Sequence, residues 1–237
     1  MPPYIQLFGP AHLFILIAVP SVAGILAFVQ RKFLGGSNKL RLGLAVALLL
    51  DTAVFYGYLI SHGLLSFPAH LPLELCDASL VLVILSLFTL NKTVFDLAYF
   101  LTLGGATMAL ITPNLWERFP SFGTVQFFVA HGLIVEGVLF LVWSGLARPR
   151  PGSIGRVMLG LNIFAALVGV FDAIFKTNYM YLRAKPNNAS LLDFLGPWPW
   201  YIVCGELIGL GIFTLLYLPF RKQAGKGSEV NPVLARN

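Results

Sequence analysis

Long apolar stretches separated by short polar segments dominate the pattern of this chain. Seven stretches are long and apolar enough to cross a bilayer, because a spanning helix needs about 20 mostly apolar residues. They cover residues 11–30, 42–61, 72–90, 93–111, 124–146, 154–175 and 198–220. The pattern therefore predicts an all-α fold, a polytopic membrane bundle of seven transmembrane helices within residues 1–222. The basic segment 223–237 is predicted to be a disordered tail.

The composition agrees with a membrane protein. Of the 237 residues, 57% are hydrophobic and 11% are charged, and the mean hydropathy is +0.81. So few charges do not cover the surface of a soluble domain, and the abundant apolar residues exclude a disordered chain. The net charge of +6 comes with no basic groove or nucleic-acid motif, so a nucleic-acid partner is not expected.

The basic residues are sorted between the two ends of the predicted helices. With the N-terminus outside, twelve of the sixteen Lys and Arg residues lie in the inner segments. Because positive residues are enriched in cytoplasmic loops, we predict an outside N-terminus and a cytoplasmic C-terminus. The first stretch is followed by positive charge rather than preceded by it, which favours a retained helix over a cleaved signal peptide.

Carboxylates fall inside the predicted spans, where a charged side chain costs about 2.5–3.5 kcal/mol at the bilayer centre. Six of the ten acidic residues lie there, with almost no Lys or Arg beside them. They are Asp51, Asp77, Asp96, Glu136, Asp172 and Glu206. We expect them to be protonated or to accept hydrogen bonds around an internal polar cavity. The alternative is a network that only holds helices together.

A polar stripe follows the second predicted helix. Asp51, Phe55, Tyr58 and His62 are spaced at i, i+4, i+7 and i+11, which places them on one side of a helix. We predict that this side faces the bundle rather than lipid. The stripe is either a structural network or a path for a proton or a substrate.

Cys76 and His131 carry the chemistry most suited to catalysis. Cys76 lies about one turn inside the third predicted helix, where the helix dipole favours a thiolate and neighbouring acids oppose it. At about 1.5 Å per residue, Cys76 is about 6 Å deep, and His131 is about 10 Å deep if Thr124 caps its helix. On facing helices such a pair suits a nucleophile and its base. The alternative for each residue is a place in the packed core.

Other catalytic sites lack their motifs here. The chain has no Gly-Xaa-Ser-Xaa-Gly elbow, no phosphate-binding loop and no His-Glu-Xaa-Xaa-His helix, and its four histidines are scattered. We therefore expect no metal and no cofactor. Cys204 is a rival thiol, and a disulfide between Cys76 and Cys204 is a weak alternative. No internal repeat of the kind found in many transporters is evident.

The longest predicted outer segment, residues 176–197, leads into the Trp- and Pro-rich start of the last helix. Trp198 and Trp200 are expected at the level of the lipid headgroups. We interpret this region as an interfacial anchor, with a headgroup-binding lid as the alternative.

Several motifs resemble the YwaF family of bacterial integral membrane proteins, over nearly the whole chain. They lie at residues 71–77, 127–132, 178–186, 190–193 and 195–201. This family is similar to vertebrate transmembrane protein 164, an acyltransferase acting on ether phospholipids, which resembles the androgen-induced lipid hydrolases with their Thr and His pair. The resemblance implies a lipid acyltransferase of the bacterial plasma membrane, with Cys76 at the nucleophile position and His131 at the general-base position.

The expected reaction runs through an acyl-cysteine. His131 takes the proton of Cys76, and the thiolate attacks an ester carbonyl of a membrane phospholipid. A second lipid alcohol then receives the acyl group, or water does so in a hydrolase. Phospholipids are thus the expected partners, as acyl donor and acceptor, and the sequence leaves the oligomeric state open.

Other residues are expected to support this site. The candidate oxyanion donors are the backbone amides at the start of the third helix, with Tyr58, His62 or Asn178. The candidate headgroup ligands are Arg183, Lys185, Trp198 and Trp200. The candidate orienting residues are Asp51, Asp77, Glu136, Asp172 and Glu206. The main alternative is a proton-coupled carrier that uses Asp51, Glu136 and Glu206 along a central path. A membrane scaffold without chemistry is a third possibility.

Overall fold

Helices form all the regular structure in residues 5–115, 117–186 and 190–221, the part of the chain that this computed structural model describes. In chain order they are α1 (Pro10–Val29), η1 (Gln30–Leu34), α2 (Lys39–Ser61), α3 (Leu75–Thr89), α4 (Lys92–Leu101), η2 (Thr102–Ala106), α5 (Thr107–Ile111), α6 (Phe122–Trp143), α7 (Ser153–Phe175), η3 (Tyr179–Tyr181), η4 (Leu191–Leu195) and α8 (Trp200–Arg221). The all-α prediction is confirmed. The predicted tail, residues 223–237, lies outside the described residues.

Six helical passes in the described ranges are long and apolar enough to cross a membrane, so the protein is a multi-pass membrane protein. The third predicted span is shorter than expected. Glu74 is extended and precedes α3, and Leu90 ends it in a left-handed conformation with φ 53°. The resulting 15 residues reach about 22 Å, less than the bilayer core of about 30 Å. A seventh span and the orientation of the termini therefore stay predictions.

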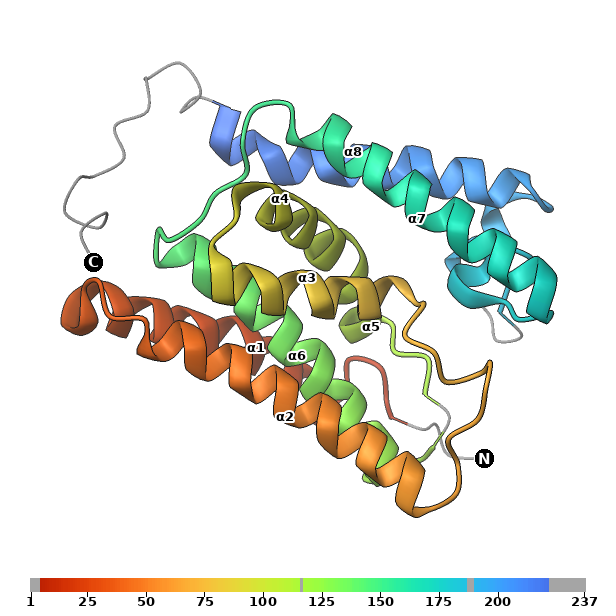
Figure 1. Cartoon of the computed structure of the whole chain (residues 1–237), viewed down its shortest axis with the longest axis horizontal. Coiled ribbons are helices and arrows are strands. Elements are labelled where there is room, and N and C mark those ends of the chain that lie inside the picture. Colours follow the sequence, from red (N-terminus) through yellow and green to blue (C-terminus); the bar gives the residue numbers. More distant parts are fainter. Residues whose placement is uncertain (1–4, 116, 187–189, 222–237) are drawn as a thin grey trace.

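The helices run roughly along one common direction (Figure 1). In that view α1, α2 and α6 lie on one side of the molecule, α7 and α8 lie on the other, and α3 and α4 lie between them. The largest buried side chains include Phe95, Phe100 and Phe140, which belong to one hydrophobic cluster between these layers. The central pass, formed by α4, η2 and α5, thus contributes many of the buried core residues.

Two adjacent glycines let neighbouring helices approach the π-helical segment η2 of that central pass. A Cβ atom on Gly104 would lie 2.7 Å from the ring of Phe213 in α8, and one on Gly105 would lie 2.9 Å from Leu75 in α3. Larger residues here would push both helices outward. The start of α3 is therefore seated on the centre of the bundle.

Most basic side chains of the described residues lie at one end of the bundle. Helices α1, α6 and α8 end there, and α2, α4 and α7 begin there. The basic residues of this end are Arg31, Lys32, Lys39, Arg41, Lys92, Arg148, Arg150, Arg156 and Arg221. We refer to it as the basic end; it is the end that we predict to be cytoplasmic.

An ion-pair cluster closes part of the basic end and corrects one expectation. The carboxylate of Asp96, which is fully buried, accepts hydrogen bonds from Arg150 Nη2 at 2.7 Å and from Arg156 Nη2 at 2.9 Å. Asp96 was expected to lack basic partners. It lies near the start of α4 rather than at mid-membrane, so arginines of the segment before α7 and of its first turn reach it.

Candidate functional site

Cys76 is the second residue of α3, at the end of the bundle opposite the basic end. The carboxylate of Asp77 accepts a hydrogen bond of 3.0 Å from the backbone amide of Glu74, which closes the first turn of the helix. Cys76 is therefore nearer the helix start than a count from Pro72 suggests, because the chain before Leu75 is not helical. At about 1.5 Å per residue, the thiol lies within the first turn.

The thiol of Cys76 meets opposing electrostatic influences. The backbone N–H groups of Cys76 and Asp77 interact with it favourably when it is charged, as expected at a helix N-terminus. The carboxyl groups of Asp77 and Glu74 repel a negative charge on it, and it is mostly removed from solvent. Both Cys76 and Cys204 are free thiols, so the disulfide alternative is not formed. The site therefore favours a protonated thiol until a base removes the proton.

A segment after α7, residues 178–184, is bound to the segment that precedes Cys76; we call it the outer strap. The backbone amide of Met180 donates a hydrogen bond of 2.9 Å to Glu74 Oε2. The hydroxyl of Tyr179 donates to the carbonyl of Pro68 at 2.6 Å and accepts from the amide of Leu71 at 3.1 Å. Burial, reinforced by nearby acids, raises the pKa of Glu74 above its ordinary value despite the bond from Met180.

Asp172 anchors the beginning of the outer strap. Its Oδ1 atom accepts hydrogen bonds from Thr177 Oγ1 at 2.6 Å and from the amide of Tyr179 at 3.0 Å, while Oδ2 is buried without a hydrogen-bond partner. The residue lies in the last turn of α7, so the predicted mid-membrane acid belongs to the boundary instead. Its role in the structure is to hold the strap.

The predicted headgroup ligands mainly stabilise the same region. Nη1 of Arg183 donates to the carbonyls of Asp172 and Thr177 at 3.2 Å each, and so caps the end of α7. The ammonium group of Lys185 lies 5.6 Å from the ring centroid of Tyr201. These contacts show an anchoring role and leave headgroup binding a prediction.

Asn178 and the two tryptophans complete this outer region. Asn178 Oδ1 accepts hydrogen bonds from the amides of Arg183 and Ala184 at 3.0 Å, so this side chain shapes the strap. Trp198 donates from Nε1 to the carbonyl of Leu182 at 3.1 Å. Trp198 and Trp200 remain 61% and 62% exposed, as suits rings at the headgroup level.

His131 lies in the middle of α6 and is buried. Ser121 rather than Thr124 caps this helix; the hydroxyl of Thr124 accepts from the amide of Ser121 at 3.0 Å as the other half of a capping box. Nδ1 of His131 is 2.7 Å from the carbonyl oxygen of Phe127, so Nδ1 must carry the proton. In the neutral ring this leaves the lone pair on Nε2.

The helices of Cys76 and His131 pack against each other, as the predicted pair requires. A Cβ atom on Gly137 of α6 would lie 2.7 Å from Val83 of α3, so the two backbones approach closely. Both helices also pack on η2. Within the described residues, no hydrogen bond joins Cys76 to His131. A reaction between them thus requires a substrate, a water molecule or a side-chain movement to bridge them.

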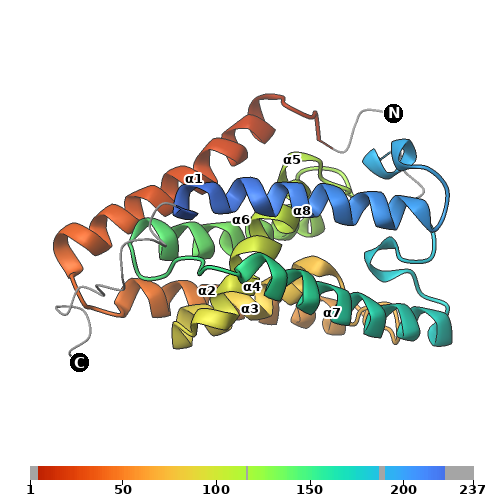
Figure 2. The ribbon, with the colours of Figure 1, turned by 90° about the horizontal axis from the view of Figure 1, so that it is seen from above.

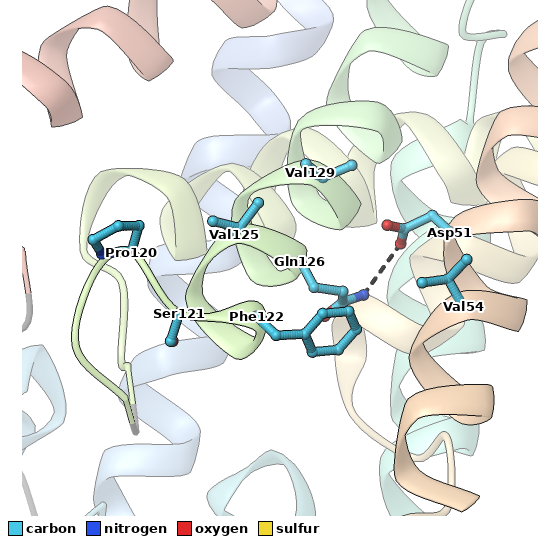
Figure 3. Close-up of a pocket in the computed structure, with 8 residues that line it drawn as sticks. All are labelled: Asp51, Val54, Pro120, Ser121, Phe122, Val125, Gln126 and Val129. Atoms are coloured by element: carbon cyan, nitrogen blue, oxygen red, sulfur yellow. Dashed lines mark hydrogen bonds between the residues drawn. The ribbon is translucent and has the colours of Figure 1, made fainter. Parts of the chain in front are cut away.

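Asp51 and Tyr58 of the predicted stripe on α2 contact α6, and Asp51 borders a cavity of about 410 Å³ (Figure 3). Gln126 Nε2 donates a hydrogen bond of 3.1 Å to Asp51 Oδ2. Nearer the end of α2, the ring of Tyr58 stacks on the ring of Phe122, with centroids 3.9 Å apart. The ring centroids of His62 and Tyr58 are 4.1 Å apart. Tyr58 and His62 thus form an aromatic column against α6.

Two tyrosines that the sequence did not single out lie on the Cys76 side instead. Tyr56 donates to the carbonyl of His70 at 3.3 Å and is close enough to Asp77 and Tyr179 to interact electrostatically. Tyr56 is five residues beyond Asp51, off the stripe, which places it on a different face of α2. Tyr179 lies in the motif at residues 178–186, and its hydroxyl group was the feature that could have marked it as a hydrogen-bonding residue.

The remaining acids do not join these groups. Glu136 lies in the middle of α6 and Glu206 in the outer half of α8, and the structure records no hydrogen bond or ion pair for either within its described ranges. Helix α8 packs on α7, η2 and η4, whereas the Asp51 cavity lies between α2 and α6. Glu206 therefore lies on a helix other than the two that border the Asp51 cavity.

The fold and this constellation define a polytopic α-helical membrane protein with a cysteine at one membrane boundary and a buried histidine on the helix packed beside it. Residues 7–217 match the TMEM164 family. The match covers most of the chain, so the protein belongs to the TMEM164 family. No match was found to a curated protein or to a solved structure.

Proposed function

We propose that this protein is a phospholipid acyltransferase in which Cys76 is the nucleophile and His131 the general base. The observation that carries the proposal is the hydrogen bond of 2.7 Å between His131 Nδ1 and the carbonyl of Phe127. It fixes the tautomer whose free lone pair is on Nε2, the atom that a base needs. Membership of the TMEM164 family and its resemblance to a lipid acyltransferase support the same chemistry.

In the first half-reaction, Nε2 of His131 accepts the proton of Cys76 Sγ. Sulfur attacks the ester carbonyl carbon of a phospholipid, the ester C–O bond breaks, and the histidine returns the proton to the departing lysophospholipid oxygen. Burial of the thiol, together with the carboxyl groups of Asp77 and Glu74, disfavours a preformed thiolate, so proton removal accompanies the approach of the substrate. A base is therefore essential to this mechanism.

In the second half-reaction, a lipid hydroxyl loses its proton to His131 and attacks the acyl-cysteine. The C–S bond breaks, the acyl group passes to the lipid, and the thiol regains its proton. Water in place of the lipid alcohol gives hydrolysis through the same intermediate, so the two activities differ only in the acceptor.

The start of α3 supplies groups for the oxyanion of each tetrahedral intermediate. The candidate donors are the backbone N–H groups of Cys76 and Asp77, which interact favourably with a charged sulfur atom; the Asp77 amide also donates to the carbonyl of Glu74 at 3.1 Å. The outer strap holds this turn through Glu74 and thus positions the nucleophile. We place the reaction in the outer half of a bacterial plasma membrane, because Cys76 lies opposite the basic end.

The test is acyl transfer between phospholipids by the purified protein in vesicles. Cys76→Ala and His131→Ala should each lower transfer about 100-fold or more, whereas the matched thiol variant Cys204→Ala should retain it. Retention of transfer by Cys76→Ala would overturn the covalent mechanism. If wild-type protein releases free fatty acid but transfers none to lipid, the protein is a hydrolase.

A further inference from the structure

A cavity lies beside α6, which is flanked by α1 and α2, at the basic end of the bundle. Both helices pack on α6, and they diverge from each other away from the segment that connects them (Figure 2). The cavity, of about 530 Å³, lies between α1 and α6. Its lining comprises Gly24, Ala27, Phe28, Arg31, Lys32 and Trp143. This volume falls within the range of ordinary ligand sites, about 300–1,000 Å³.

The cavity combines uncompensated positive charge with an apolar wall. Arg31 makes one long hydrogen bond, 3.5 Å from Nη1 to the carbonyl of Trp143, and the ammonium group of Lys32 lies 5.3 Å from the ring centroid of Phe28. Within the described residues, neither cation forms an ion pair. By contrast, Arg150 and Arg156 at the same end of the bundle both form ion pairs with Asp96. The site therefore has the charge to attract an anion.

The segment that carries both cations is held in place. Gln30 is buried, and its Nε2 atom donates to the carbonyls of Gly35 and Ser37 at 2.8 and 2.9 Å. These bonds fix the π-helical turn η1 on which Arg31 and Lys32 lie. A π-helical turn is frequently found at functional sites, and a fixed turn lowers the entropy lost when a ligand binds.

The apolar wall has room for a hydrocarbon chain. A Cβ atom on Gly24 would lie 3.8 Å from the Trp143 ring, so glycine keeps the space beside the indole open. The exposed faces of Phe28 and Trp143 border this space at the level where rings contact lipid glycerol groups. Cations beside an apolar wall match an anionic lipid better than a soluble anion.

We propose that this cavity binds one anionic phospholipid of the leaflet at the basic end, predicted to be cytoplasmic. Arg31 and Lys32 hold its phosphate, and an acyl chain lies along Gly24, Phe28 and Trp143. Cys76 lies in the first turn of α3 at the opposite end of the bundle, so this lipid is bound separately from the acyl-transfer site. The proposal does not depend on the proposed function.

The test is native mass spectrometry of the full-length protein in detergent, titrated with phosphatidylglycerol or with phosphatidylcholine of the same acyl chains. Wild-type protein should bind phosphatidylglycerol at least about tenfold more tightly. The double variant Arg31→Gln, Lys32→Gln should lose this preference. The control pair Lys39→Gln, Arg221→Gln removes the same charge from exposed residues of the basic end outside the cavity and should keep it.

Shape is tested separately from charge. Gly24→Leu should weaken phosphatidylglycerol binding about tenfold with both cations intact, because its side chain fills the space beside Trp143. A lack of lipid preference in wild type, or equal loss in the control pair, would overturn the proposal in favour of general surface attraction. Displacement of the lipid by an equal concentration of glycerol phosphate would identify a soluble-anion site. Wild-type-like binding by Gly24→Leu would show that no acyl chain lies beside Gly24. If that variant does not fold, the binding measured with the charge variants tests the proposal.

Discussion

Glu74 accepts a hydrogen bond of 2.9 Å from the backbone amide of Met180. The contact joins residues 106 positions apart and ties the outer strap to the residue that precedes the helix of Cys76. The Glu74 side chain also forms a capping box with Asp77, so a substitution at this position tests the strap contact and the helix cap together.

Glu74→Ala should remove this contact, leave the Met180 amide without its partner and destabilise the folded protein by about 1–3 kcal/mol. Acyl transfer should fall as well, because the first turn of α3 is then less well positioned. Glu74→Gln retains an acceptor oxygen and should keep most of both properties. Unfolding in detergent and transfer rates measure the two effects; equal losses in Ala and Gln variants would show that the charge, not the hydrogen bond, matters.

The pH dependence of stability should report the buried carboxyl of Glu74. Burial raises its pKa in the folded protein, so the folded state binds the proton more tightly than the unfolded state does. Its stabilising contribution is complete below the ordinary glutamate pKa of 4.5 and is lost as pH rises through the raised value. Comparing melting temperatures of wild type and Glu74→Gln across this window should show a steeper decline in wild type. Parallel curves would show that the carboxyl group of Glu74 does not cause this pH dependence.

Tyr179→Phe should destabilise the outer strap by about 1–3 kcal/mol, because the hydroxyl serves both Pro68 and Leu71. Tyr58→Phe is the matched control. Tyr58 keeps its stack on Phe122 without the hydroxyl, so this variant should change stability by less than about 0.5 kcal/mol. Hydrogen exchange of the segment around Leu71 measures the local effect. Similar protection in both variants would indicate that the tyrosine ring alone holds the strap.

Asp96→Asn should destabilise the basic end, because Arg150 and Arg156 then lose their shared carboxylate. We expect about 2 kcal/mol, less than the 3–5 kcal/mol of a fully buried pair, because water screens the partly exposed arginines. Thermal unfolding of the variant beside Asp193→Asn, a change to an exposed acid, measures the difference. An unchanged melting temperature for Asp96→Asn would mean that the ion pairs add no net stability.

Apolar length and periodicity predicted the helices well because each signal is local. The all-α fold followed from the apolar pattern, and the spacing of the Asp51 stripe predicted a bundle-facing side, on which Asp51 contacts α6. The third span was predicted too long, since hydropathy does not register that Glu74 is extended before α3. A helix cap depends on the backbone geometry of individual residues, which the apolar pattern does not show. For the same reason Thr124 was predicted to cap α6, whereas Ser121 caps it.

The candidate site was predicted less completely, because its contacts join distant segments. Asp96 pairs with Arg150 across 54 positions, and no local pattern in the chain connects the two residues. The strap contacts of Tyr179 with Pro68 and Leu71 were likewise hidden. Residue chemistry identified Cys76 and His131, whereas only folding shows that their helices pack together.

The most direct test of the acyl-transfer mechanism is mass spectrometry of the protein after brief incubation with a phospholipid that carries an isotope-labelled acyl chain. The mechanism predicts a labelled, hydroxylamine-sensitive thioester on the peptide containing Cys76, absent from Cys76→Ala and retained in Cys204→Ala. Rapid lipid acyl transfer with no label on Cys76 under single-turnover conditions would contradict it.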